Sequence, residues 1–107
     1  MGCSYQIGGS TYYGTTPKYK LTIDADIPMS EFDFNVELEC EDNSLTIPKS
    51  EMPIGKDGSY YLCFDTTRLG IGKVKAVITA FIPDSDFGSG TRKEVFVINN
   101  LLDIKEV

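Results

Sequence analysis

Apolar and polar residues alternate along most of the chain after residue 18. The clearest case is FDFNVELEC (32–40), where the aromatic and aliphatic side chains occupy every second position and Asp33, Glu37 and Glu39 lie between them. A period of two predicts a β-strand with one buried and one solvated face, as in antiparallel sheets. KLTIDA (20–25) alternates in the same way, and no segment of the chain shows the period of a helix.

Turn signals divide the rest of the chain at intervals of about ten residues. The strands expected between the turns are SLTI (44–47), SYYLCFD (59–65), KVKAVITAFI (73–82) and RKEVFVIN (92–99). TTRLGIG (66–72) is expected to form a corner with one short helical turn, and LLDIKEV (101–107) a short apolar tail. The pattern predicts an all-β fold, a single antiparallel β-sandwich of six to seven strands with Ig-like topology. The chain has no tryptophan, so the Cys–Trp–Cys core of antibody domains is absent.

The N-terminal segment differs from the rest of the chain in composition. MGCSYQIGGSTYYGTTPK is rich in Gly, Ser, Thr and Tyr and has little that could build a core. It is predicted to be an extended N-terminal arm (1–18) before the sandwich domain (19–107). Tyr5, Tyr12 and Tyr13 are candidates to anchor the arm on a neighbouring subunit, because tyrosine gives a large contact area at low entropic cost. The alternative is that the arm forms an extra edge strand of its own domain.

The formal net charge is −6, and the acidity is concentrated in one stretch. Residues 24–42 hold eight acids and no Lys or Arg, whereas the rest of the chain holds eight acids and ten bases. Asp33, Glu37 and Glu39 fall on one strand face and are candidates to dock on a basic partner. The alternative is a solvated face that discourages unwanted strand pairing. Nucleic-acid binding is not expected, because it needs clustered basic residues.

Membrane attachment is not expected either. No apolar run approaches the ~20 residues of a spanning helix, and the N-terminus lacks the pattern of a signal peptide. MGCSYQ has Gln6 where the myristoylation pattern needs Ser or Thr. Cys3, Cys40 and Cys63 show no CxxC spacing, so we expect no zinc site and reduced thiols. A Cys40–Cys63 bridge is the alternative.

The residues offer little support for catalysis. The chain has no histidine, the commonest general base. Glu37 and Glu39 would lie about 6.5–7 Å apart on a strand, a separation found in glycosidases, but on a face with no sign of a cleft. The pairs Tyr12–Tyr13 and Tyr60–Tyr61 could stack on sugars, although neighbours on a strand face opposite ways, so packing is the favoured interpretation.

The loop PDSDFGSG (83–90) has some likeness to a calcium loop, with Asp84 and Asp86 as oxygen ligands. Phe87 stands where a third ligand would be needed. The favoured interpretation is a turn, in which Pro83 ends one strand, the aspartates form the turn and Gly88 and Gly90 supply positive φ. We therefore expect no metal, no cofactor and no enzymatic activity.

The last third of the chain resembles a known group of proteins. Residues 65–95, DTTRLGIGKVKAVITAFIPDSDFGSGTRKEV, resemble small β-sandwich structural proteins of tailed phages and prophages of Bacteroidales, crAss-like relatives included. The marks are a strand that runs into Ile-Pro-Asp-Ser-Asp-Phe (82–87), followed by Gly-Thr-Arg-Lys-Glu-Val (90–95). The likeness extends over about residues 19–98. The chain departs from the group at Gly88–Ser89, where the group has Pro-Asp.

The resemblance implies a non-enzymatic virion structural protein, made in the host cytoplasm, in a head or tail appendage, decoration or adaptor. Such a protein would dock on other virion proteins, as a homo- or hetero-oligomer, through its N-terminal arm and surface strands. No catalytic residue is carried over. The alternative function is a carbohydrate- or protein-binding β-sandwich domain of an adhesin.

Overall fold

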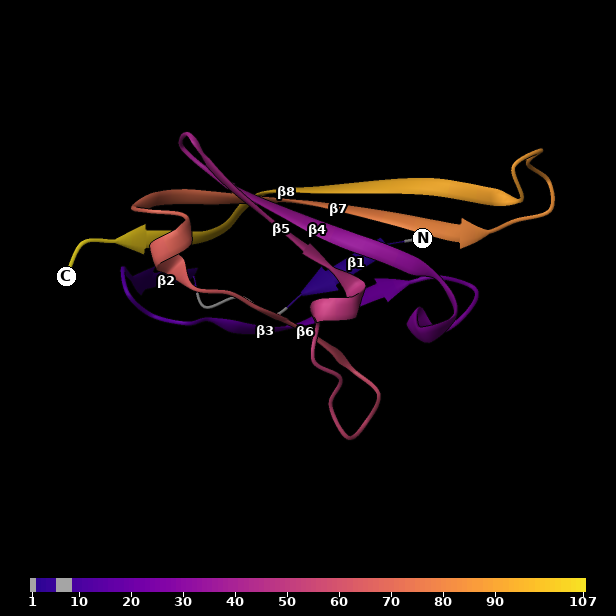
Figure 1. Cartoon of the computed structure of the whole chain (residues 1–107), viewed down its shortest axis with the longest axis horizontal. Coiled ribbons are helices and arrows are strands. Elements are labelled where there is room, and N and C mark those ends of the chain that lie inside the picture. Colours follow the sequence, from indigo (N-terminus) through magenta and orange to yellow (C-terminus); the bar gives the residue numbers. More distant parts are fainter. Residues whose placement is uncertain (1, 6–8) are drawn as a thin grey trace.

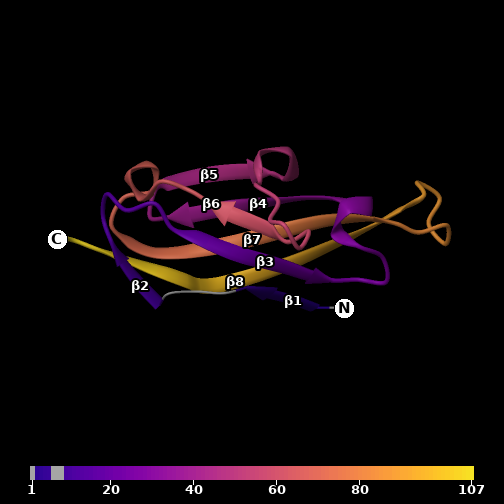
Figure 2. The same ribbon diagram turned by 90° about the horizontal axis from the view of Figure 1, so that it is seen from below.

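A computed structural model describes residues 2–5 and 9–107; for residues 2–5 it defines the backbone only. The described chain is all-β and forms two sheets that lie one over the other in a sandwich-like arrangement (Figures 1 and 2). The three-stranded sheet has the order β1 (Gly2–Tyr5), β3 (Lys18–Asp24), β6 (Tyr60–Cys63). The five-stranded sheet has the order β2 (Gly9–Tyr12), β8 (Thr91–Lys105), β7 (Gly72–Pro83), β4 (Asp33–Cys40), β5 (Asn43–Pro48). The predicted all-β class is confirmed.

All strand pairs are antiparallel except β2 with β8, which is parallel. Within the described ranges, three short 3-10 turns lie in the connections: η1 (Met29–Glu31), η2 (Lys49–Glu51) and η3 (Thr66–Arg68). The η3 turn is the corner expected from TTRLGIG, and it is followed by Gly70 with φ of +87°. The strands β4 to β8 come from the predicted sandwich domain, and β3 begins at Lys18, the last residue of the predicted arm. The strands β1 and β2 come entirely from the predicted arm.

The alternating pattern produces the core. On β3, β4 and β7 every second side chain is buried, and these side chains face one another between the sheets. Neighbouring strands are in register, with Val36 opposite Ile47 on one side and Ile78 on the other. The largest fully buried side chains are Phe34, Leu38, Leu69, Ile78, Leu101, Leu102 and Ile104.

The C-terminal segment differs from the prediction. Residues 101–105 were expected to be a separate tail, but they continue β8 after an irregularity opposite Val74 and Ala76. Their partners are the beginning of β7 on one side and β2 on the other. Leu101, Leu102 and Ile104 are buried there, which explains why this segment is apolar.

The predicted arm contributes edge strands rather than a separate extension. β1 pairs with β3 in one sheet, and β2 pairs with β8 in the other. The residues that follow β2 are attached to the domain through the buried Thr66. Its hydroxyl donates to the Thr15 carbonyl at 2.9 Å and accepts from the Gly14 amide at 2.9 Å. The predicted arm therefore forms edge strands of its own domain, as in the alternative interpretation.

Lys49 joins two connections that are distant in the sequence. Its Nζ atom donates hydrogen bonds to the carbonyl oxygens of Met29 at 2.9 Å, Ser30 at 3.2 Å and Phe32 at 2.7 Å. These carbonyls belong to the segment between β3 and β4, while Lys49 follows β5. One ammonium group thus satisfies three backbone acceptors that lie outside the strands, and it joins η1 to η2.

We expect Lys49→Met to lower the free energy of unfolding by about 1–3 kcal/mol, because the substitution keeps the aliphatic stem but leaves the three carbonyls without their donor. Urea denaturation measures the change. Lys56→Met, at an exposed lysine in the 55–58 turn, is the matched control and should stay within about 0.5 kcal/mol of the parent. Equal losses in the two variants would contradict the role given to Lys49.

Candidate functional site

The predicted acidic residues project from one face of β4. Asp33, Glu37 and Glu39 alternate with buried side chains, so all three lie on the outer face of the five-stranded sheet. Directly opposite them on β7 stand Phe81, Val77 and Lys75, respectively. Glu39 and Lys75 approach each other at 3.9 Å, with both side chains over 40% exposed. Such an exposed pair contributes little stability.

The same outer face carries apolar side chains that the alternating pattern did not single out. Val95 and Val97 on β8 are 51% and 52% exposed. They stand opposite Thr79 and Val77 of β7, and Phe81 is half-buried on the same face. The signal was present in the run VFVI (95–98), which has apolar residues on both strand faces. The result is a surface with an apolar part on β7 and β8 beside an acidic row on β4, which we call the outer face.

The N-terminal tyrosines lie elsewhere. Tyr12 ends β2 opposite Lys105, and the Tyr13 amide donates to the Lys105 carbonyl at 2.8 Å. Their side chains are 56% and 42% exposed. Two strands, β8 and β7, separate β2 from β4, so the structure does not join the tyrosines and the acids in one site. The backbone of Tyr5 lies in β1, and its side chain is outside the described part of the chain.

The second tyrosine pair follows the strand rule. Tyr60 is buried and packs edge-on against Phe34, with ring centroids 5.3 Å apart. Tyr61 faces outward, and the Lys18 ammonium lies 4.7 Å from its ring centroid. Only one member of this pair is accessible, so the two rings cannot form a joint sugar platform.

Asp84 holds the loop PDSDFGSG (83–90) together through hydrogen bonds within the loop and to the beginning of β8. Its Oδ1 atom accepts from the Asp86 amide at 3.0 Å, and its Oδ2 atom accepts from Arg92 Nη1 at 2.6 Å. The Asp84 amide donates to the Gly90 carbonyl at 2.9 Å, and Gly90 has φ of +78°. Positive φ was expected at Gly88 as well, but among the described residues of this loop only Gly90 has it. Because both carboxylate oxygens have protein partners, the aspartate acts as a turn former.

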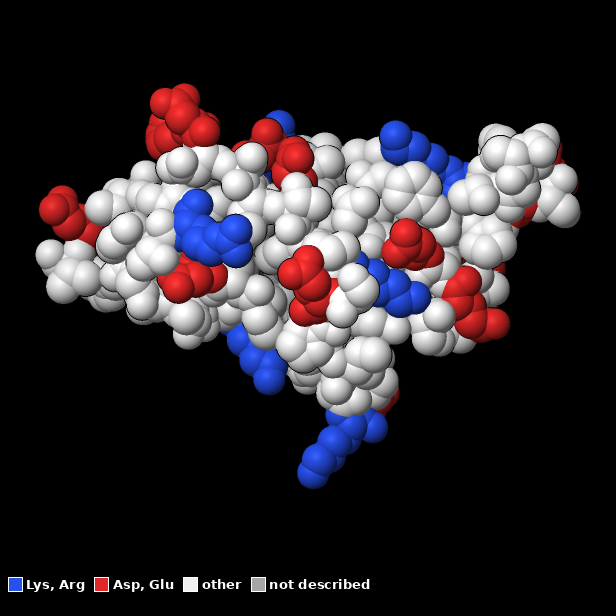
Figure 3. Space-filling model, viewed as in Figure 1, with Lys and Arg blue, Asp and Glu red and all other residues white. Residues whose placement is uncertain are grey.

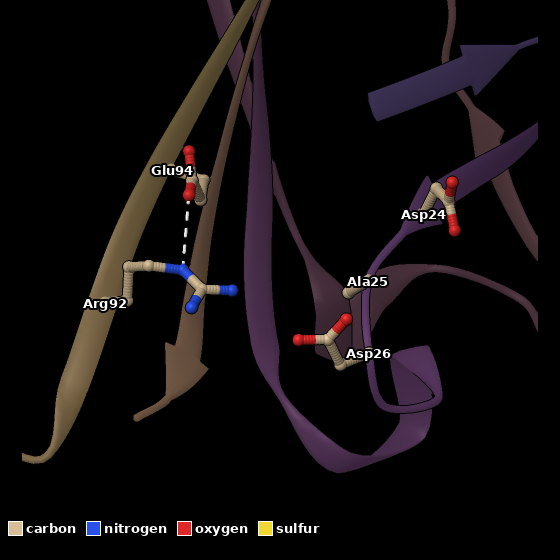
Figure 4. A pocket seen from close by; sticks show the side chains of 5 residues that line it. All are labelled: Asp24, Ala25, Asp26, Arg92 and Glu94. Atoms are coloured by element: carbon tan, nitrogen blue, oxygen red, sulfur yellow. Dashed lines mark ion pairs between the residues drawn. The ribbon is translucent and has the colours of Figure 1, made fainter. Parts of the chain in front are cut away.

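A shallow cavity of about 390 Å³ lies between the end of β3 and the beginning of β8. Asp24, Ala25, Asp26, Arg92 and Glu94 line it (Figure 4). Arg92 points into the space and faces Asp26, while its Nε atom lies 3.2 Å from Glu94 Oε1. That contact is an ion pair without hydrogen-bond alignment, since Arg92 Nε has no hydrogen-bond partner. The guanidinium thus neutralises two carboxylates of the same hairpin, those of Asp84 and Glu94.

The cysteines are free thiols where they are described. Cys40 is buried and Cys63 is half-buried, and they form no bridge. Burial raises the pKa of the Cys40 thiol, and the nearby charges of Glu41 and Asp103 raise it further. A raised pKa keeps the thiol protonated and makes it a poor nucleophile.

Other titratable groups act in turns. The hydroxyl and the amide of Thr67 lower the pKa of the exposed Asp65, which caps η3. Among the side chains that the structure describes, those of residues 9–107, no group of three or more His, Cys, Asp or Glu is placed to hold a metal ion.

The surface charges are mixed on the side that Figure 3 shows. Acidic side chains gather at the tip of the β4–β5 hairpin, and basic and acidic side chains alternate elsewhere. Within the described ranges, no helix is long and apolar enough to cross a membrane.

Comparisons with family models, curated proteins and solved structures gave no match to this chain.

We expect Asp84→Asn to destabilise the β7–β8 hairpin, because the amide can still accept in the turn but no longer carries the charge that pairs with Arg92. The expected loss is about 1–2 kcal/mol for a charge-assisted, partly buried hydrogen bond. Urea denaturation and amide hydrogen exchange over residues 84–91 measure it. The control is Asp86→Asn in the same exposed turn, which should leave both unchanged. A larger effect at residue 86 than at residue 84 would refute this account of the loop.

Proposed function

We propose that the chain is a non-enzymatic docking domain of a tailed-phage particle that binds other virion proteins through the outer face of its five-stranded sheet. The observation that carries the proposal is the combination on one open face of exposed Val95 and Val97 with the acidic row Asp33, Glu37 and Glu39. An apolar centre bordered by charge is typical of protein–protein interfaces. The resemblance of residues 65–95 to phage structural proteins supplies the class of particle.

An Ig-like topology is part of the proposal. The strand order β1-β3-β6 facing β2-β8-β7-β4-β5 supports it. In this interpretation the first strand of the domain is split between the two sheets: β1 runs antiparallel to β3, and β2 runs parallel to the last strand. The two sheets and the connections that cross between them support a Greek-key arrangement. Because β7 pairs with β4 on one side and with β8 on the other, we expect the outer face to change little on docking.

The absence of histidine, the raised pKa of Cys40 and the commitment of Arg92 to its carboxylates all favour a binding role over catalysis. The edge strands β1 and β2 offer a second mode of attachment. Each is four residues long, too short for extensive strand pairing, so this attachment would use exposed side chains such as Tyr12 on β2. The adhesin alternative depends on exposed tyrosines, and Tyr12 with Tyr13 is the pair that supports it.

We expect the chain to be present in purified particles of the phage that encodes it, as detected by mass spectrometry. The double variant Glu37→Lys/Glu39→Lys should lower its incorporation about tenfold or more, because it reverses the charge that faces the partner. Glu31→Lys is the matched control. Glu31 belongs to the same acidic stretch but lies on η1, away from the outer face, and the variant should incorporate normally.

Absence of the parent chain from particles would sink the proposal. Equal incorporation of the two variants would show that the outer face is not the docking surface. Tyrosine-dependent binding on a glycan array, lost in Tyr12→Ala, would support the adhesin alternative instead.

A further inference from the structure

One sheet edge in the described part of the chain is long and open. β8 pairs with β7 along residues 91–98, but β2 covers only residues 102–105 on the other side of β8. Among the described residues, no other strand or backbone hydrogen bond occupies the outer side of residues 91–98. Figure 2 shows this half of β8 at the margin of the five-stranded sheet, with β1 running along the same margin in the other sheet.

The other open edges are protected in ways that this one is not. β1, β2 and β6 are four residues long, and β5 is six residues long and ends at Pro48. Short edges and proline are the usual protections against further strand pairing. The open edge of β8, from Thr91 to Ile98, contains neither Pro nor Gly. Its second half, Val-Phe-Val-Ile, has high strand propensity.

Apolar side chains flank this edge on both faces. Val95 and Val97 are about half exposed on the outer face, and Phe96 and Ile98 are half-buried on the inner face. A strand added at this edge would cover all four side chains. The edge therefore has the backbone and the side chains of a strand-pairing interface, but it lacks a partner strand.

We propose that the partner strand is the same segment of a second copy. The two segments pair antiparallel and form a symmetric dimer with one continuous sheet across both copies. A two-fold axis normal to the sheet keeps outer residues with outer residues and inner with inner. With the axis at Phe96, each Val95 faces Val97 of the other copy and the two Phe96 side chains meet on the inner face. Glu94 then faces Ile98, so no like charges are opposed.

Neighbouring registers are poorer. An axis at Val95 places Lys93 opposite Val97 and Glu94 opposite Phe96. An axis at Glu94 opposes two carboxylates directly, which is destabilising. An axis at Val97 pairs only residues 96–98 within the open edge and sets Asn99 opposite Val95. Self-complementarity of both apolar and charged residues thus selects a second copy as the occupant and Phe96 as the centre.

The dimer would join the outer faces of two molecules. Four valines, two from each copy, would form one apolar strip across the axis, with an acidic row on either side. A single strand pair is small compared with the ~800 Å² per partner of stable complexes, so we expect the dimer to form only at high protein concentration. Many copies on a particle, as the proposed function implies, would raise the local concentration.

The test is sedimentation equilibrium of the full chain over a concentration series. We expect a reversible monomer–dimer equilibrium in the parent chain. Val95→Lys/Val97→Lys should weaken it about tenfold or more, because it opposes lysines directly across the axis. The matched control is Thr46→Lys, at an exposed position on the same outer face of β5, which should dimerise as the parent does. Thermal unfolding should show that all variants fold, since the substituted side chains are exposed in the monomer.

A charge swap identifies the register. In Val95→Lys/Val97→Glu, the axis at Phe96 sets each lysine opposite a glutamate, so dimerisation should return to about the parent level. An axis at Val95 or at Val97 would oppose like charges instead, and the swap would then remain monomeric. A parent chain that stays monomeric at about 1 mM overturns the proposal, and so does a swap that fails to restore the dimer. Glu37→Lys/Glu39→Lys should leave the dimer intact, so loss of docking and loss of dimerisation can be told apart.

Discussion

The pairing of β7 with β4 on one side and β8 on the other is the constraint on which the rest of the structure depends. β7 runs from Gly72 to Pro83, and it has a partner on both sides along most of its length. Its inner side chains from Val74 to Ile82 are all buried. Two of them, Ala76 and Ala80, are small, so the larger side chains of the facing sheet can pack against them. A one-residue slip of β7 would turn this whole face to solvent, so the register of the sheet is strongly specified.

The two sheets differ in length, and the difference creates the features of functional interest. β7 and β8 have 12 and 15 residues, whereas the strands of the facing sheet have four to seven. At the far end of the β7–β8 hairpin the facing sheet ends, and a cavity bordered by Arg92 and Glu94 remains (Figures 1 and 4). Arg92 can lie on the inner face there only because Asp84 and Glu94 compensate its charge. A second difference in length, between β8 and its four-residue neighbour β2 in the same sheet, leaves residues 91–98 with one unpaired side.

The amino-acid pattern was informative where burial decides which way a side chain points. The alternation in 32–40 predicted which residues of β4 are buried and placed Asp33, Glu37 and Glu39 on one face. The turn at Pro83–Gly90 followed from residue chemistry, because proline ends a strand and Asp84 mimics a backbone acceptor. The run VFVI in 95–98 was less informative, because apolar residues on both faces do not indicate which face is covered. The role of Lys49 could not be predicted from the sequence. Its three acceptors lie in the connection before β4, whereas Lys49 follows β5.

The sequence by itself therefore determined the strand class, the inner and outer faces of the central strands, the main turns and the concentration of acidic charge. These follow from local rules: the period of two, the φ of proline and the hydrogen bonding of aspartate within its own turn. Only the tertiary structure decided that β1 and β2 each extend a different sheet, that residues 101–105 continue β8, and that the tyrosines and the acids lie apart. These depend on which strands become neighbours. Strand neighbours are chosen by backbone hydrogen bonds and packing between segments from opposite ends of the chain, which no local pattern encodes.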